Sequence, residues 1–173
     1  MTREFLLVYI DIIVFISIKI KKVNSRMQLI RNLLSFGASR QEMIHFWILF
    51  CRSVLEQSCV LWHSSLTQEN SDDLERTQKT FTKLLLKDEY KDYEEALLKL
   101  NLEKLSNRRE KLSLNFSKDG LKFDTLSDLL KKKENKHIME TRKSENYEVN
   151  FSNTERMKKS SVIYFQNLLN NEH

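Results

Sequence analysis

The stretch TQENSDDLERTQKTFTKLLL, residues 67–86, carries the clearest structural pattern in the sequence. Thr67 is a favoured N-cap residue, and the turn after it is acidic, as the positive end of a helix macrodipole prefers. Apolar and amide positions then recur at intervals of three and four residues, which places them on one helical face. They are Leu74, Gln78, Phe81 and Leu85. The pattern predicts an amphipathic helix that begins after Thr67.

The preceding segment predicts a pair of helices joined by a short turn. Helical spacing runs from residue 21 to residue 36, and Gly37 stands where a left-handed C-cap is expected. Ser39 and Glu42 have the spacing of a capping box for the next helix. The stripe expected on that second helix consists of Met43, Phe46, Trp47, Phe50, Val54 and Leu55. These two helices are expected to form an αα-hairpin.

The C-terminal half continues with helical patterns of decreasing strength. Asp92 and Glu95 predict the start of a short helix, and a further helix is expected from Leu105, through Leu112 and Phe116, to a stop at Gly120. Residues 131–160 are polar and basic and predict a linker or disordered tail, before a last helix at 162–169. We therefore expect a mainly α fold, a small bundle of about four to six amphipathic helices. Its expected divisions are residues 1–20, 21–117 and 118–173.

Composition excludes several classes of protein. The chain has 173 residues with no proline and only two glycines, which disfavours turn-rich sandwiches and barrels. Glycine-rich phosphate loops need clustered glycines, so nucleotide-loop enzymes are excluded as well. The net charge of +5 suits contact with phosphate without being extreme. Cys51 and Cys59 are too few for a disulfide scaffold, which favours an intracellular location, in the nucleus or the cytoplasm.

Residues 5–18, FLLVYIDIIVFISI, form an apolar run with three interpretations. Lysines follow the run, as they follow a membrane anchor. However, its 14 residues fall short of the roughly 20 that span a bilayer, and Asp11 lies at its centre. A buried helix or strand is favoured over an unstructured start or a membrane anchor. The β-branched content leaves helix and strand open.

For the potential metal ligands and catalytic groups, structural roles are favoured over metal binding or catalysis. His45, Cys51, Cys59 and His63 match no compact zinc-finger spacing. Only Cys59 and His63, four residues apart, would share a helical face. A buried thiol beside a polar histidine is favoured over a metal pair or a nucleophile pair. We therefore expect no catalytic residue, metal or cofactor.

Structural explanations are also available for the charged and aromatic candidates. The pair Asp72 and Asp73 fits the acidic first turn of a helix better than a two-metal site. Trp47 and Trp62 are interpreted as core or interface anchors rather than stacking platforms. Of the adjacent Arg108 and Arg109, one is expected to line a groove while the other pairs with an acid such as Asp88 or Glu94. Lysines 131–133 and Lys136 are interpreted as a solvated helix end.

One set of residues, in a fixed order along the chain, is more specific than any helical pattern. It is carried by Arg52, Val54, Leu55, Glu56, Trp62, Ser65, Leu66, Thr67, Leu74, Glu75, Gln78 and Lys79. Upstream it continues in Lys22, Ser25, Arg26, Leu29 and Arg31, and downstream in the run 93–97, Leu100, Leu102, Leu105, Arg108 and Arg109. Near the end it includes Arg142, Tyr147, Thr154, Arg156, Ser160 and the run 168–170.

This order resembles the thumb and post-thumb part of reverse transcriptases from non-LTR retrotransposons of the LINE-like, jockey type. The resemblance covers about residues 21–170 and departs from the family at Ser53, Gln57, Ser58 and Val60. It implies a helical fragment of an RNA-directed DNA polymerase without the palm aspartates, and hence a chain that does not catalyse polymerisation. Its implied partner is an RNA/DNA primer-template, and self-association through exposed apolar helix faces is also expected.

The resemblance implies a set of cations that grip the nucleic-acid backbone without reading sequence. They are Lys22, Arg26, Arg31, Arg52, Lys79 and Lys83. Two other readings stay open. One is a non-enzymatic helical interaction protein held at a membrane by residues 5–18, and the other is a translated product without function.

Overall fold

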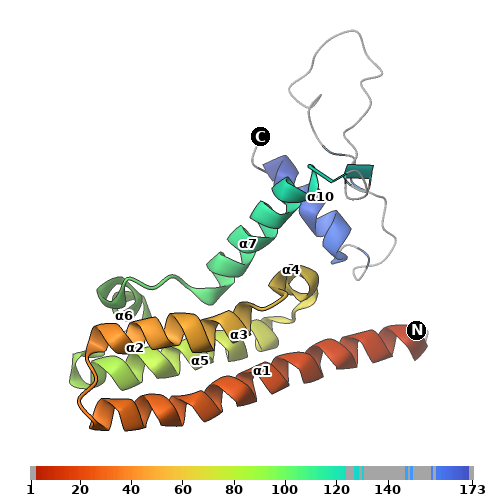
Figure 1. The fold of residues 1–173 in the computed structure, drawn as a ribbon. Helices are drawn as coiled ribbons and strands as arrows, with labels where there is room; N and C mark the ends of the chain where they lie inside the picture. Colours follow the sequence, from red (N-terminus) through yellow and green to blue (C-terminus); the bar gives the residue numbers. More distant parts are fainter. Residues whose placement is uncertain are drawn as a thin grey trace. The chain divides into compact units, whose positions relative to one another are not determined.

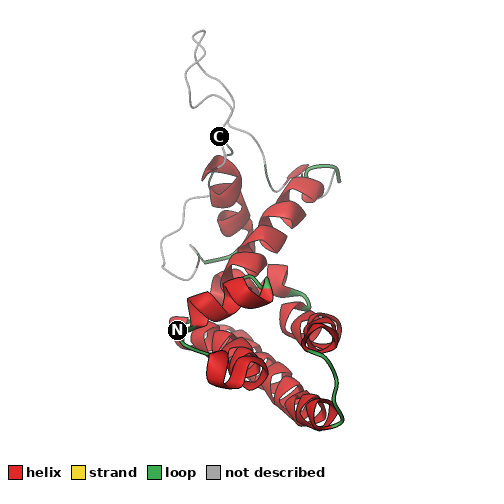
Figure 2. Ribbon diagram, turned by 90° about the vertical axis from the view of Figure 1, so that its left-hand side faces the viewer, coloured by secondary structure: helices red, strands yellow, loops and turns green. Residues whose placement is uncertain are grey.

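The computed structural model is mainly helical, which confirms the expected fold class (Figures 1 and 2). It describes residues 3–123, 127–128, 130, 147, 149, 157 and 159–171, with side chains from residue 12 onward. The chain divides into two compact units. The first contains residues 1–58 and 66–108, and the second contains residues 59–65 and 109–173. The expected linker at 131–160 lies almost wholly outside the described residues.

Helix α1 (Arg3–Ser35) is a single element of 33 residues that includes the apolar run. It therefore takes the helical alternative, and it runs unbroken across residues 20 and 21, where the sequence suggests a division. Its buried face consists of Ile16, Lys19, Val23, Met27 and Ile30. The helix ends as expected at Gly37, whose φ is +88°. The amides of Gly37 and Ala38 donate to the carbonyls of Leu34 and Leu33, which is a Schellman cap.

The second arm of the hairpin combines α2 (Arg40–Phe46), a π-helix η1 (Trp47–Arg52) and α3 (Ser53–Glu56). The capping box of Ser39 and Glu42 is confirmed. The wider π turn changes which residues reach the core, because it adds nearly one residue per turn. Cys51 is fully buried, whereas Phe50, expected in the core stripe, is 51% exposed. The expectation for Phe50 was wrong because it assumed uniform α spacing.

Helix α5 (Gln68–Leu86) supplies the centre of the first unit. Its N-cap is Thr67, and Leu74, Gln78, Phe81 and Leu85 are buried as predicted. In this unit α1 packs against α5 and α3. The indole of Trp47 stacks on Phe81 with ring centroids 4.5 Å apart, so the core assignment of Trp47 is confirmed. Burial of such aromatic pairs is a main source of stability for small helical units.

The first unit closes with η3 (Lys87–Glu89), α6 (Tyr93–Leu100) and the first residues of α7 (Leu105–Gly120). Asp92 caps α6 by accepting from the amide of Glu95, as the sequence predicts. Asn101 then takes a left-handed conformation that ends α6. The predicted stop of α7 at Gly120 is also confirmed.

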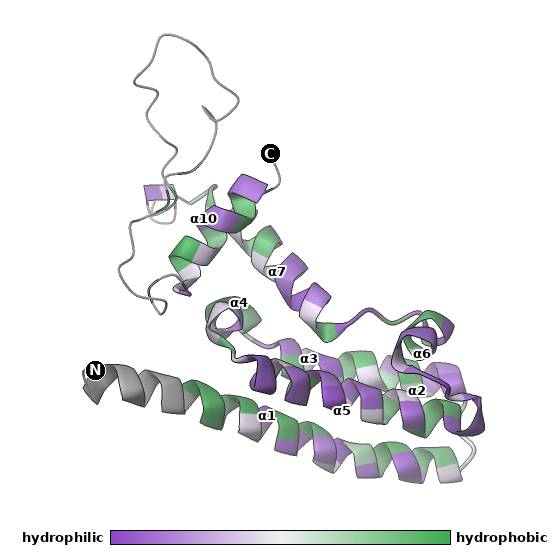
Figure 3. Ribbon diagram, turned by 180° about the vertical axis from the view of Figure 1, so that it is seen from behind, coloured by the Kyte–Doolittle hydropathy of each residue, from purple (hydrophilic) through white to green (hydrophobic). Residues whose placement is uncertain are grey.

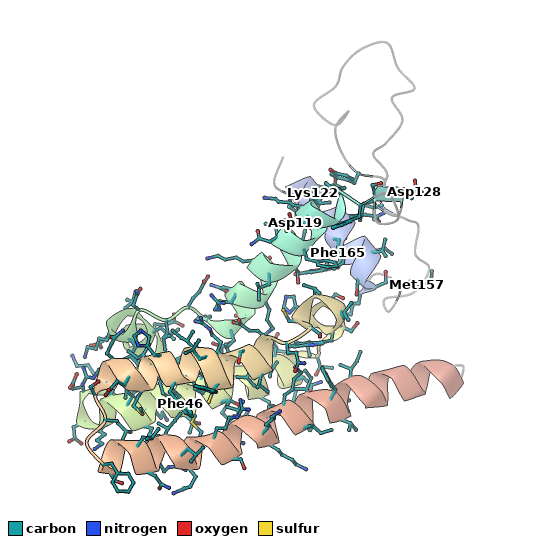
Figure 4. All side chains as sticks on the ribbon, in the orientation of Figure 1. Phe46, Asp119, Lys122, Asp128, Met157 and Phe165 are labelled. Atoms are coloured by element: carbon teal, nitrogen blue, oxygen red, sulfur yellow. The ribbon has the colours of Figure 1, made fainter. Side chains whose placement is uncertain are left out.

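The second unit contains α4 (Cys59–Trp62), the 3₁₀ turn η2 (His63–Ser65), most of α7, and α10 (Ser161–Asn171), close to the helix expected at 162–169. Its apolar cluster consists of Leu130, Tyr147, Phe165 and Leu169. The Asn170 side chain bonds both backbone groups of Tyr147, at 2.7 and 3.2 Å. Phe165, labelled in Figure 4, lies 5.7 Å from the Phe116 ring, centroid to centroid.

The part of α7 in the second unit buries a polar face. Arg109, Ser113 and Ser117 are each at most 1% exposed, whereas Phe116 is 38% exposed. The expected stripe of Leu112 and Phe116 therefore does not describe the buried side of this helix. At its C-terminal end, Asp119 of α7 and Lys122 beyond it form an exposed ion pair of 2.6 Å (Figure 4).

Candidate functional site

A carboxylate of α5 organises the junction of α5, α6 and α7 in the first unit. The two oxygens of Glu75 accept from the backbone amides of Leu105 and Ser106, at 3.2 and 3.3 Å. Glu75 also accepts a short hydrogen bond from the hydroxyl of Tyr93. A carboxylate at the first amides of a helix satisfies donors that have no intrahelical partner and complements the macrodipole. Glu75 thus caps α7 from a distance of 30 residues in sequence.

Gln78 extends this network one turn along α5. Its side-chain nitrogen donates to the Tyr93 hydroxyl at 3.1 Å and to the backbone carbonyl of Glu103 at 2.9 Å. Gln78 is fully buried. Burial, followed by the contact with Glu75, raises the pKa of Tyr93, so its phenol stays protonated and keeps donating. The network is therefore a fixed structural junction.

A second polar cluster joins the end of α3 to the start of α7. Arg108 donates to both oxygens of Glu56, at 2.5 Å from Nε and 3.0 Å from Nη2. Arg52 lies 3.9 Å from the same carboxylate. Burial lowers the pKa of Arg52, and the neighbouring charge of Arg108 lowers it further. Two guanidinium groups thus share Glu56, and such bidentate pairing fixes geometry strongly.

These contacts decide the roles of Arg108 and Arg109. Arg108 is the residue that pairs with an acid, but its partner is Glu56 instead of the expected Asp88 or Glu94. Glu94 pairs with Lys104 instead, at 2.5 Å. Glu56 is the last residue of α3, and the packing of the first unit places it beside the start of α7, 52 positions away in sequence. Arg109 is buried, so it lines no open groove.

The six cations expected at a nucleic-acid backbone all belong to the first unit, but they have different surroundings. Arg26 donates to the backbone carbonyl of Phe50, and Arg52 takes part in the Glu56 cluster. These two side chains therefore have structural partners. The exposed members of the set are Lys22, Arg31, Lys79 and Lys83.

Helix geometry separates these four exposed cations. Successive residues turn by about 100°, so Lys22 and Arg31 lie on opposite sides of α1. Lys79 and Lys83 are about one turn apart on α5, and the Lys83 ammonium lies 5.3 Å from the Tyr90 ring centroid. The pair on α5 is thus the most compact cationic element among the residues expected to contact phosphate.

A shallow cleft between α1 and α5 was not expected from the sequence. It has a volume of about 250 Å³ and is lined by Ile20, Asn24, Asp73, Arg76, Thr77 and Thr80. The ion pair of Asp73 and Arg76 (2.5 Å) lies at its wall. Asp72 accepts from Gln68 at 2.8 Å, so both aspartates have partners within α5. Their position near the start of this helix is the one predicted.

The thiols and histidines are dispersed. Cys51 and Cys59 are both free and buried. Burial raises the pKa of the Cys51 thiol to about 11, which opposes nucleophilic chemistry. Within the described residues, no group of three or more His, Cys, Asp or Glu side chains could hold a metal ion.

The second unit places His63 in an apolar and cationic setting. Its ring contacts Tyr164 edge-on, with centroids 5.6 Å apart. Burial, and then the charge of Arg109, lowers the pKa of His63 to about 4. The imidazole is therefore neutral at ordinary pH and cannot form an ion pair with the Cys59 thiolate. Trp62 is buried, in agreement with the interpretation as a core anchor.

Several expected residues lie outside the described part of the chain. They are lysines 131–133, Lys136, Arg142, Thr154 and Arg156. By length and composition, one helical run among the described residues, Arg40–Ser65, is apolar enough to cross a bilayer. Because this run also supplies core residues such as Trp47 and Leu55, the feature is weak evidence for a membrane span.

Comparisons of the chain with protein-family models, with curated proteins and with solved structures find no match.

Proposed function

We propose that this chain is a non-catalytic helical relative of the thumb and post-thumb part of non-LTR reverse transcriptases, and that it binds the nucleic-acid backbone without sequence preference. The proposal is supported by one observation: the two polar clusters are built from residues that carry the resemblance. Glu56, Glu75 and Gln78 come from one stretch that carries the resemblance, and Tyr93 and Arg108 come from the stretch downstream of it. Gln78 and Glu75 both bond to Tyr93, and Arg108 bonds to Glu56.

This coincidence has a physical meaning. A resemblance produced only by helical periodicity would match apolar positions and leave polar ones arbitrary. Here five of the matched polar side chains, those named above, connect α3, α5, α6 and α7. A buried polar network needs every member, because removing one partner leaves another unsatisfied. The matched residues therefore behave as a structural framework.

The binding surface in this proposal is the exposed cationic side of the first unit, with Lys79 and Lys83 as its centre. Lys22 and Arg31 lie on opposite sides of α1 and therefore do not both face the same duplex, while Arg26 and Arg52 hold the scaffold. Such a surface neutralises phosphates and orients the duplex without contacting base edges. The expected ligand is an RNA/DNA primer-template duplex.

Fluorescence anisotropy of the full chain on a labelled RNA/DNA duplex tests the proposal. If about four phosphates are contacted, affinity falls by about 100-fold when salt rises from about 50 to about 200 mM. The variant Lys79→Glu with Lys83→Glu should lose most of the binding and flatten the salt dependence. Lys91→Glu, at an exposed lysine before α6, is the matched control and should change little.

The proposal fails if the folded protein does not bind, or if the control variant weakens binding as much as the double variant. Circular dichroism and thermal unfolding of each variant establish that the fold is intact. The alternative of a helical interaction module rests on the apolar run at residues 5–18, within α1. A chain without function would show neither binding activity.

A further inference from the structure

The outer face of α1 combines exposed apolar side chains with cations. The exposed fractions of Val14, Phe15, Ile18 and Leu29 are 49%, 39%, 57% and 52%. By helical geometry, Val14, Ile18, Lys21, Lys22, Ser25 and Leu29 fall within about 100° of arc. The buried residues Ile16, Val23 and Met27 lie on the opposite side. The hydrophobic turns of this helix are visible in Figure 3.

The charge on this helix has one sign. Between residues 12 and 35 there is no aspartate or glutamate, and the cations are Lys19, Lys21, Lys22, Arg26 and Arg31. Lys19 and Arg26 are held by backbone carbonyls of the second arm. Lys21 and Lys22 stay exposed beside Val14 and Ile18. The face therefore requires a partner that accepts apolar groups and is negatively charged.

Two other partners fit this face less well. Contact with a nucleic-acid backbone would use Lys21 and Lys22 and leave Val14, Ile18 and Leu29 without a role. Pairing with a second copy about a two-fold axis would bury the apolar groups, but it would bring lysines toward lysines with no acid on the face to neutralise them.

We propose that the outer face of α1 docks on an anionic lipid surface. Val14, Ile18 and Leu29 enter the boundary between headgroups and acyl chains, while Lys21 and Lys22 extend along the surface to the phosphates. The helix lies in the plane of the membrane and does not cross it, because its opposite face is occupied by the core of the first unit. This inference shares Lys22 with the cations considered for nucleic-acid binding, but it rests on Val14, Ile18 and Lys21, which that proposal does not use.

Vesicle flotation with the full chain tests the inference. Vesicles of phosphatidylcholine are compared with vesicles that also contain about 30% phosphatidylserine, at low and at physiological salt. The protein should bind the anionic vesicles at least about tenfold more strongly, with a loss at high salt. Truncation of the first residues is unsuitable because Ile16 and Lys19 belong to the core.

Point variants separate the two contributions. Val14→Ser with Ile18→Ser, and separately Lys21→Glu with Lys22→Glu, should each weaken vesicle binding by about tenfold. The matched controls lie on other faces of the first unit. Leu98→Ser changes an apolar residue that is 82% exposed on α6, and Lys79→Glu with Lys83→Glu reverses two exposed lysines on α5. Both controls should retain vesicle binding within about twofold.

Circular dichroism verifies the fold of each variant, and the lysine variant keeps the test valid if the serine variant is unstable. Equal binding to neutral and anionic vesicles would overturn the inference, as would unchanged binding of Lys21→Glu with Lys22→Glu. Sedimentation provides a further check. If Val14→Ser with Ile18→Ser dissociates a dimer and leaves vesicle binding intact, the face is an interface between copies instead.

Discussion

The side-chain nitrogen of Lys19, on α1, lies 2.8 Å from the backbone carbonyl oxygen of Val54, on α3. The same ammonium donates to the carbonyl of Gln57 at 3.0 Å, and it lies 4.5 Å from the Phe15 ring centroid. The last carbonyls of a helix have no intrahelical donor, and they form the negative end of its macrodipole. A buried lysine thus caps the second arm of the hairpin from the first.

Replacing Lys19 with Met should destabilise the protein by about 2 kcal/mol. The substitution keeps an unbranched side chain but leaves two carbonyls at the end of α3 without this donor. Urea unfolding followed by circular dichroism measures the effect. Lys21→Met, at an exposed neighbouring lysine, should stay within about 0.5 kcal/mol. Equal losses in the two variants would contradict the capping role.

Glu75 and Tyr93 should show strong energetic coupling. Tyr93→Phe removes one hydrogen bond to Glu75, and Glu75→Ala removes that bond together with the cap of α7. We expect losses of about 1 and about 3 kcal/mol, with the double variant less destabilised than their sum by about 1 kcal/mol. Unfolding of all four proteins completes the cycle. Glu94→Ala, which removes an exposed ion pair, is the control. If the losses of stability from Tyr93→Phe and Glu75→Ala are additive in the double variant, the coupling is refuted.

Deletion of Leu49 tests the role of the π-helix. Leu49 is exposed within η1, and removing one residue there converts the π turn to α spacing while Trp47 and Leu55 keep their buried direction. The deletion should therefore leave a folded protein. Deletion of Lys79 from the regular helix α5 rotates the following residues by about 100° and should abolish cooperative unfolding. Similar damage from both deletions would show that η1 does not act as a register adjustment.

Acidification should destabilise the protein through His63. An unfolded histidine binds a proton near pH 6.5, whereas the pKa of His63 in the fold is about 4. Between these values the unfolded chain holds more protons, so the free energy of unfolding falls as pH decreases. Allowing for partial exposure, the contribution of His63 is about 2 kcal/mol.

The measurement for His63 is urea unfolding at several pH values from about 7.5 to about 4.5. His63→Gln should flatten the dependence on pH in this window, because glutamine does not titrate. His45→Gln changes an exposed histidine on α2 and serves as the control. A dependence that is the same in the native protein and in His63→Gln would show that other groups cause it.

Local signals in the sequence were sufficient for most of the helix ends. Capping by Ser39, Thr67 and Asp92 depends on a side chain and an amide three residues away, so the sequence alone identifies it. Gly37 ends α1 as predicted, because the C-cap of this helix needs a left-handed residue, and α7 ends at Gly120 as predicted. The spacing on α5 gave its buried face directly.

The residues for which the expectation failed depend on distant contacts. Phe50 lies outside the core because a π turn interrupts the α spacing. No local sequence motif marks that turn. Arg108 pairs with Glu56 across 52 positions, which a helix-by-helix reading does not anticipate. The spacing of apolar residues also does not predict the buried polar face of α7 at Arg109 and Ser113.

The mainly helical fold and the caps at Ser39, Thr67 and Asp92 follow from the amino-acid sequence, because each depends on residues within a few positions of one another. Which cations bond to the scaffold and which face solvent follows only from how the helices pack. Lys19, Arg26 and Arg52 look like the exposed Lys22 and Lys79 in sequence, but carbonyls and a carboxylate from other helices hold them. The partners of a long charged side chain depend on how the helices pack.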